Sequence, residues 1–233
     1  MTAAVLITRP EPGAAETAAA VATLGWRPIL APALVLRAIP PERLPAAQAL
    51  LLPSRAAARA LPPSAMPVLA VGAGTAAEAR ACGFPDVICA EGDAASLVVL
   101  AAARLDPAAG PLLLAVGRGY SAELAADLRA RGFRVLRRVV YEASPAEALP
   151  PEAIDALARG AVAAALFTSP RCARITLALM RHAGLAEAAH GIRALAISAR
   201  IAEALAPLPW ATREVTARPD PTLLPGLLGP APG

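Results

Sequence analysis

The chain has 233 residues, of which 57% are hydrophobic, and it carries a formal net charge of +4. Charged residues, Pro or Gly interrupt every apolar run before it reaches the roughly 18 to 20 residues of a membrane-spanning helix. The first apolar stretch is followed by Arg9, whereas a signal peptide places its basic residues before the apolar stretch. We therefore expect a cytoplasmic protein with no membrane partner. Aromatic residues make up only 3% of the chain and the Arg residues are dispersed, so we expect an acidic small molecule and not a nucleic acid as its ligand.

Short Val-, Ile- and Leu-rich runs alternate along the chain with Ala-rich stretches of helical length. Most of the short runs are continuously apolar, which is typical of strands covered on both faces in a parallel sheet. The predicted strands are residues 4–8, 28–36, 49–52, 68–71, 87–90, 112–116, 134–141, 161–168, 193–197 and 213–216. The predicted helices are residues 11–24, 55–61, 75–82, 94–104, 122–131, 151–159, 170–183, 199–205 and 221–228. This alternation predicts a doubly wound α/β fold with parallel sheets, flavodoxin-like or Rossmann-like.

Two proline-rich segments, residues 39–41 and 144–151, separate the middle of the chain from its two ends. Proline restricts the backbone and lacks the N–H donor of a sheet ladder, so such segments rarely extend a sheet. We therefore predict two α/β domains. The first is discontinuous and comprises residues 1–36 and 145–233, and the second is inserted at residues 37–144.

Six turns each follow a predicted strand and precede a helix. Ligands of open α/β sheets bind beyond the carboxyl ends of the strands, where free N–H groups and the positive ends of helix dipoles attract anions. Taken singly, each turn is explained equally well as a helix cap. Four of the six turns place Arg beside a small residue, and the six turns together favour an anion site. The turns are residues 8–13, 53–55, 72–75, 117–121, 168–171 and 198–200.

Several cofactor and catalytic motifs do not occur in these turns. The Gly-x-Gly pairs at residues 72–74 and 117–119 lack the third glycine of a dinucleotide fingerprint, and a chain without Lys has no P-loop. No Gly-x-Ser-x-Gly elbow occurs, and no His is placed to activate a Ser. The three Cys residues form no Cys-x-x-Cys pair, which favours buried thiols over a disulfide or a zinc site, so we expect no metal.

The turns and strand ends also carry short motifs. The order of these motifs along the chain is stronger evidence for a protein family than any single motif is. They are residues 5–10 (VLITRP), 71–76 (VGAGTA), 117–119 (GRG), 139–141 (VVY) and 166–170 (LFTSP). Together they resemble the uroporphyrinogen-III synthase family, in which V-G-x-x-T-A, V-x-Y and F-T-S-P segments follow one another in this order. The resemblance extends over nearly the whole chain.

The resemblance implies two α/β lobes joined by a two-stranded linker, and a reaction that uses no cofactor or metal. The family closes hydroxymethylbilane, a linear tetrapyrrole, to uroporphyrinogen III with loss of water and inversion of ring D. The many carboxylates of this substrate fit turns that present helix N-termini and Arg. Hydroxymethylbilane synthase is the candidate supplier of the substrate, and we expect a monomer because no stripe suited to an oligomer interface is visible.

Tyr141 matches the family's candidate tyrosine for assisting the loss of water. The alternative, an amphipathic tyrosine at a wet interface, stays open. The rest of the implied mechanism is conformational, because the enzyme must hold the bilane so that ring D attacks through its substituted carbon, via a spiro intermediate. The residues expected to bind substrate through N–H, hydroxyl or guanidinium groups are Arg9, Ser54, Arg55, Gly72, Gly74, Thr75, Gly117, Arg118, Thr168, Ser169, Arg171, Ser198 and Arg200.

Two turns depart from the family's pattern. Residues 52–55 (LPSR) stand where an F-T-S-x turn is usual, and residues 198–201 (SARI) stand where a G-P-T-T-like turn is common. These departures motivate an alternative function, that of a non-catalytic tetrapyrrole-binding relative. A third possibility, a two-lobed sensor of another small anion, rests only on fold analogy.

Overall fold

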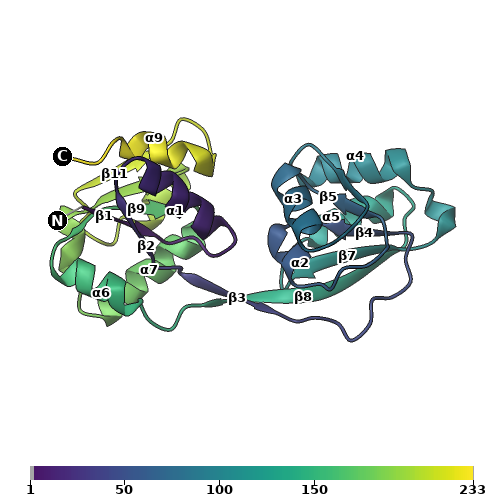
Figure 1. Ribbon diagram of the computed structural model, residues 1–233, viewed down its shortest axis with the longest axis horizontal. Helices are drawn as coiled ribbons and strands as arrows, with labels where there is room; N and C mark the ends of the chain where they lie inside the picture. Colours follow the sequence, from purple (N-terminus) through teal and green to yellow (C-terminus); the bar gives the residue numbers. More distant parts are fainter. Residues whose placement is uncertain (1–2, 233) are drawn as a thin grey trace. The chain divides into compact units, whose positions relative to one another are not determined.

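The computed structural model describes residues 3–232, which form two compact units (Figure 1). Unit 1 comprises the described residues up to Val35 and from Ser144 onward, and unit 2 comprises Leu36–Ala143. Unit 2 is thus an insertion in the sequence of unit 1. Among the described residues, no helix is both long and apolar enough to cross a membrane.

Unit 1 contains a five-stranded, fully parallel sheet in the order β11-β10-β9-β1-β2. Counted along the chain, this is the order 2-1-3-4-5 of flavodoxin-like folds. The central strands are covered on both faces, which explains why every residue of β1 is buried. The strands are β1 (Ala4–Ile7), β2 (Arg27–Leu30), β9 (Val162–Phe167), β10 (Arg193–Ala196) and β11 (Thr212–Val215).

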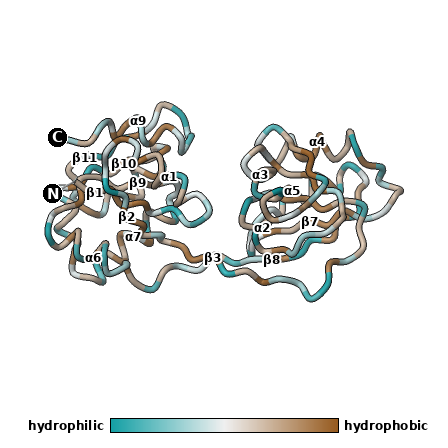
Figure 2. Tube along the Cα trace, in the orientation of Figure 1, coloured by the Kyte–Doolittle hydropathy of each residue, from teal (hydrophilic) through white to brown (hydrophobic). Residues whose placement is uncertain are grey.

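Alternate residues of these strands face two separate cores. One core packs the sheet against α6, α7 and α8, and the other packs it against α1 and α9. In Figure 2 the central strands carry many of the hydrophobic stretches and the loops many of the hydrophilic ones. The helices are α1 (Gly13–Thr23), α6 (Pro151–Ala158), α7 (Pro170–His182), α8 (Ala199–Ala204) and α9 (Leu224–Leu228).

Unit 2 contains a six-stranded sheet in the order β3-β8-β7-β4-β5-β6. The run from β8 to β6 is parallel and has the chain order 5-4-1-2-3, which is the Rossmann-like order 3-2-1-4-5 read from the other edge. The strands are β3 (Leu34–Ala38), β4 (Ala49–Leu52), β5 (Val68–Ala70), β6 (Val87–Cys89), β7 (Leu112–Gly117) and β8 (Val135–Pro145). Strands β3 and β8 are neighbours, and both continue across the boundary between the units, so they form a two-stranded linker.

The helices of unit 2 also cover both faces of their sheet. One core lies under α2 (Arg55–Arg59) and α3 (Ala73–Ala81), and the other lies under α4 (Ala94–Arg104) and α5 (Ala122–Ala130). The predicted fold class, parallel sheets with helices alternating with strands, is therefore confirmed. Short 3₁₀ turns at residues 107–109, 186–191 and 221–223 complete the described elements.

Two predicted strands differ from the structure by more than one residue at an end. The predicted strand 28–36 is divided, because β2 ends at Leu30 and β3 begins at Leu34. Pro32 lies in the gap and has no N–H to donate, whereas Ala31 and Ala33 on either side donate to the end of β1 and to Thr8. The predicted strand 134–141 instead continues to Pro145, which is possible because a proline is tolerated at a strand end.

Candidate functional site

The order of the strands places a topological switch point in each sheet, and ligands of open α/β sheets bind beyond the strand ends there. In unit 1 the switch point lies between the neighbouring strands β1 and β9, and in unit 2 it lies between β4 and β7. The turns that follow these strands are the predicted turns 8–13, 168–171, 53–55 and 117–121. Each unit therefore brings two of the six predicted turns side by side.

In unit 1, the turn after β1 is tied to the end of β9. The buried Thr8 hydroxyl donates to the Leu166 carbonyl at 2.7 Å. Arg9 then folds back over the start of α1, where its Nη1 donates to Thr17 Oγ1 at 3.2 Å. A Cβ at Gly13 would collide with the Arg9 guanidinium, so the glycine is what allows this position.

The second turn of this switch point begins α7. Ser169 caps the helix by accepting from the Cys172 N–H at 3.1 Å, and the first turn holds Arg171 and no acidic residue. Burial raises the pKa of the Cys172 thiol, and the hydrogen bond with Ser169 and the charges of Arg171 and Arg9 oppose that rise. Both guanidinium groups are thus close enough to this helix start to act on the thiol electrostatically, which makes the region attractive to an anion.

The turn after β10 lacks a side-chain cap on the helix that follows it. Ser198 stands at the N-cap of α8 but makes no side-chain cap hydrogen bond, and the helix has only 6 residues. Arg200 lies in its first turn, which contains no acidic residue.

In unit 2, the turns after β4 and β5 lead into α2 and α3, which pack together on one face of the sheet. Ser54 caps α2 by accepting from the Ala57 N–H at 3.2 Å. The Arg55 side chain reaches the start of α3, where its Cδ lies 3.8 Å from the position that a Cβ on Gly74 would take. Gly72 is the N-cap of α3, whereas Thr75 is only 6% exposed, so its hydroxyl offers little surface to a ligand.

Tyr141, near the end of β8, lies close to this turn. Its Oη is 3.2 Å from Ser54 Oγ. Burial raises the pKa of the Tyr141 phenol, the hydrogen bond with Ser54 lowers it in part, and Tyr120 adds a small upward effect. Tyr141 is therefore a half-buried phenol that keeps its proton at neutral pH.

The turn after β7 contacts the same tyrosine. The Arg118 N–H donates to the Tyr141 carbonyl at 2.9 Å, and a Cβ on Gly117 would lie 2.6 Å from Tyr141 Cζ. The Arg118 guanidinium is already paired with Glu142, with 3.0 Å between Nε and Oε2. Arg118 is thus a candidate for binding substrate whose charge is partly neutralised by Glu142.

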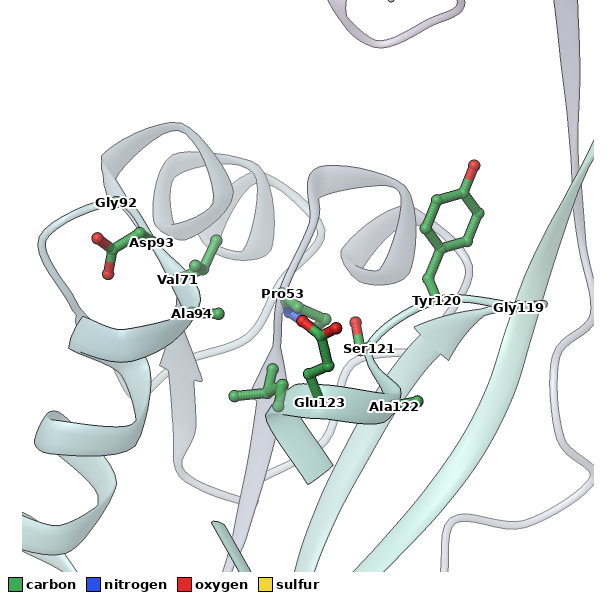
Figure 3. A pocket seen from close by; sticks show the side chains of 11 residues that line it. Pro53, Val71, Gly92, Asp93, Ala94, Gly119, Tyr120, Ser121, Ala122 and Glu123 are labelled. Carbon is green, nitrogen blue, oxygen red and sulfur yellow. The ribbon is translucent and has the colours of Figure 1, made fainter. Parts of the chain in front are cut away.

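A pocket of about 530 Å³ lies at the carboxyl edge of the unit 2 sheet (Figure 3). Its walls come from the turns after β4, β5, β6 and β7. Asp93 and Glu123 bring carboxylates to it from the starts of α4 and α5, and the Tyr120 ring points away from Glu123 in this view. The turn after β6 was not among the predicted turns, although Gly92 and Asp93 between a strand and a helix were a signal that could have identified it.

The acidic residues divide the helix starts into two classes. Helices α4 and α5 carry their own carboxylates, because Asp93 caps α4 through the Ser96 N–H at 2.7 Å and Glu123 lies in the first turn of α5. The first turns of α3 and α7 contain no acidic residue. The positive ends of α3 and α7 are therefore not neutralised by acidic residues of their own first turns and favour anions.

No group of three or more His, Cys, Asp or Glu side chains in residues 3–232 is arranged to hold a metal ion. The arrangement offers backbone N–H groups, hydroxyls, guanidinium groups and a protonated phenol. These groups can bind carboxylates and can donate a proton.

Comparisons with known proteins bear on the family and the fold of the chain. The family model described as uroporphyrinogen-III synthase HemD matches residues 15–223. A uroporphyrinogen-III synthetase structure from Helicobacter pylori is 15% identical, with a TM-score of 0.61 over 98% of each chain, and this likeness shows the fold. The wild-type uroporphyrinogen III synthase from the extremely thermophilic bacterium Thermus thermophilus is 22% identical, with a TM-score of 0.44 over 97% of this chain and 96% of that one. No curated protein sequence matches this chain. Because the family model matches nearly the whole length of the chain, the chain belongs to the uroporphyrinogen-III synthase family.

Proposed function

We propose that the chain is a uroporphyrinogen-III synthase that closes hydroxymethylbilane to uroporphyrinogen III, with loss of water and inversion of ring D. The observation that carries the proposal is the family match over residues 15–223. The convergence of predicted site residues at the switch points of two parallel sheets supports it, because ligands of such sheets bind there.

Carboxylate binding is the first task of such an enzyme. In unit 1 we assign it to the start of α7 with Ser169 and Arg171, to Thr168 and to Arg9, with Ser198 and Arg200 as further contacts. Each charge-assisted hydrogen bond of this kind contributes about 1.5–3 kcal/mol before ordering costs.

In unit 2 we assign carboxylate binding to the start of α3. Gly72 and Gly74 present N–H groups there, and Arg55 lies against this helix start. Thr75 is assigned a contact through its N–H, since its side chain is buried. Gly117 and Arg118 border Tyr141, and Arg118 shares its charge with Glu142.

The chemical step needs a proton for the departing hydroxyl group. In the proposed mechanism, the Tyr141 phenol gives its proton to that hydroxyl, so that water leaves and an azafulvenium cation and a phenolate remain. The phenolate takes up the proton that the ring D carbon releases when the ring closes and the pyrrole regains its aromaticity. The raised pKa of Tyr141 keeps the phenol in the protonated form that can donate. The remaining work is geometric, because ring D must attack through its substituted carbon to give the inverted product.

The test is a coupled assay in which hydroxymethylbilane synthase generates the bilane from porphobilinogen and the uroporphyrin isomers are separated by chromatography. Isomer III supports the proposal. Isomer I alone, the product of closure without inversion, contradicts it. Tight binding of uroporphyrinogen III without turnover would instead assign the chain to the non-catalytic alternative, which the altered turns at residues 52–55 and 198–201 motivate.

A further inference from the structure

Tyr141 is brought to Ser54 by an irregularity in the pairing of β7 with β8. The register places Val116 opposite Val139 but Gly117 opposite Tyr141, so β8 has one extra residue at this point. Such an extra residue changes the direction in which the following side chain points. The irregularity lies at the carboxyl end of β7, where the site is.

The packing of three consecutive residues of β8 follows from this irregularity. Val139 packs in the core under α4 and α5, and Val140 packs in the core under α2 and α3. Regular alternation would return Tyr141 to the first of these cores, yet it packs against the second, on the face that carries α2. The shifted register therefore places the phenol on the face where Ser54 begins α2.

Gly117 provides the space that the phenol ring occupies. A Cβ at this position would lie 2.6 Å from Cζ, 2.8 Å from Cε2 and 2.9 Å from Oη of Tyr141. These separations are shorter than any side chain tolerates without a shift, and the neighbouring Arg118 N–H fixes the Tyr141 backbone through its carbonyl. Glycine at residue 117 is thus required by the tyrosine ring.

The hydrogen-bonding capacity of Ser54 limits what its hydroxyl can do. A serine hydroxyl has one proton and two lone pairs, and one lone pair accepts the Ala57 N–H at 3.2 Å. Tyr141 Oη lies 3.2 Å away, and either oxygen could be the donor in that contact. If Tyr141 donated to Ser54, its only proton would be engaged and could not reach a leaving group. If Ser54 donates, the phenol proton stays available.

We propose that Ser54 is a positioning residue for Tyr141, whose hydroxyl donates to the tyrosine Oη while Gly117 leaves room for the ring, so that the phenol O–H points toward the substrate. This inference rests on the proposed function. It reassigns Ser54, which was expected from the sequence to bind a substrate carboxylate, to the orientation of the proton donor.

A double-mutant cycle of Ser54→Ala and Tyr141→Phe in the isomer assay tests this assignment. Loss of one hydrogen bond predicts that Ser54→Ala lowers kcat roughly five- to ten-fold with little change in KM. In the Tyr141→Phe background, where no phenol oxygen is left to accept, Ser54→Ala is expected to cause no further loss. A raised KM at unchanged kcat, or an equal loss in both backgrounds, would show that Ser54 contacts the substrate itself and would overturn the proposal.

Two further variants separate orientation from helix capping. Ser54→Thr keeps both the cap and the donor and is expected to retain kcat. Ser54→Gly removes the hydroxyl but remains an acceptable N-cap, so it is expected to fold and to lose kcat as Ser54→Ala does. Full activity of Ser54→Gly would contradict the proposal.

A spectroscopic measurement tests the same hydrogen bond without turnover. The chain has only two tyrosines, so in a Tyr120→Phe background the tyrosinate absorbance reports Tyr141 alone. Loss of a donor to the phenolate predicts that the titration midpoint rises in Ser54→Ala and does not move in Ser54→Thr. An unchanged midpoint in Ser54→Ala overturns the proposed direction of the bond. A wild-type chain that makes no isomer III would refute the proposed function, and this titration would still decide the hydrogen bond.

Discussion

Two glycines, one at the start of α1 and one at the end of β7, are explained by the side chains that lie over them. Gly13 makes room for the Arg9 guanidinium, and Gly117 makes room for the Tyr141 ring. From the sequence, Gly117 was interpreted as part of a glycine-rich, anion-binding turn. The tyrosine over it could not be predicted, because the contact depends on the register between β7 and β8 and not on local spacing.

Replacement of Tyr141 by Phe removes the phenol proton and leaves the ring that fills the space over Gly117. If the phenol assists the departure of water, kcat is expected to fall, by about a hundred-fold at the lower end of the usual range for acid catalysis. KM and the melting temperature are expected to stay close to those of the wild type, since no packing is lost. Steady-state kinetics of isomer III formation measures this, and an unchanged kcat would remove Tyr141 from the mechanism.

Replacement of Gly117 by Ala forces a methyl group into the Tyr141 ring. We expect a loss of about 1–3 kcal/mol in the free energy of unfolding, typical of overpacking, and a fall in kcat as the phenol is displaced. Gly191→Ala is the matched control, because a Cβ there meets nothing within 4 Å. Chemical denaturation gives the two unfolding free energies and the isomer assay gives kcat, and equal effects of the two substitutions would contradict the packing that we describe.

At the scale of elements, the helix caps of unit 1 form a natural pair. Ser169 and Ser198 both occupy N-cap positions, but only Ser169 accepts a hydrogen bond from its helix. Ser169→Ala is therefore expected to destabilise unit 1 by about 1 kcal/mol, and Ser198→Ala by a few tenths at most. Thermal unfolding of the two variants measures the difference, and a larger loss from Ser198→Ala would refute it.

Arg193 connects β10 to two other elements. Its guanidinium binds both carboxylate oxygens of Glu214 on β11, each at 2.9 Å, and donates to the carbonyls of Leu227 and Leu228 in α9. The hydrogen bond from Arg193 holds the pKa of Glu214 below its ordinary value of 4.5. The ion pair therefore stabilises the folded state fully at pH values above the ordinary pKa of a glutamate. This contribution is lost as the pH falls through the lowered pKa of Glu214.

Arg193→Leu is expected to cost about 1–2 kcal/mol at neutral pH, mainly through the lost carbonyl hydrogen bonds, because a partly exposed ion pair contributes little. Faster amide hydrogen exchange in α9 is expected to accompany this loss. Glu214→Gln keeps the contacts to α9 and serves as the control, with a smaller loss that disappears in acid. Unchanged exchange in α9 of Arg193→Leu would contradict this role.

Most elements could be predicted from the sequence because apolar runs and helix caps are local signals. The sequence places Ser54, Asp93, Ser121 and Ser169 where N-caps belong, and all four stand at helix starts in the structure. All but Ser121 make a side-chain cap hydrogen bond. The break at Pro32 was visible in the sequence but was outweighed by the apolar residues around it. The turn after β6, with Gly92 and Asp93, was not predicted as part of the site, although it also follows a strand end and begins a helix.

At the scale of the whole molecule, the strand order could not be predicted, although it is what organises the candidate site. Apolar runs show that strands are buried but not which strands are neighbours. The orders 2-1-3-4-5 in unit 1 and 3-2-1-4-5 in unit 2 place a switch point in each sheet. Turns that were equivalent in the sequence thereby acquire different roles, and those at the switch points carry Arg9, Ser169 and Ser54.

The central claim is that the chain is an enzyme that controls how a carboxylate-rich bilane closes. The most direct measurement is the fraction of isomer III formed from a constant supply of hydroxymethylbilane as the amount of chain increases, with heat-inactivated chain as the control. Because uncatalysed closure gives isomer I, the fraction of isomer III is expected to rise from near zero to near completeness as the enzyme outpaces that reaction. A product that remains isomer I at every concentration would contradict the claim.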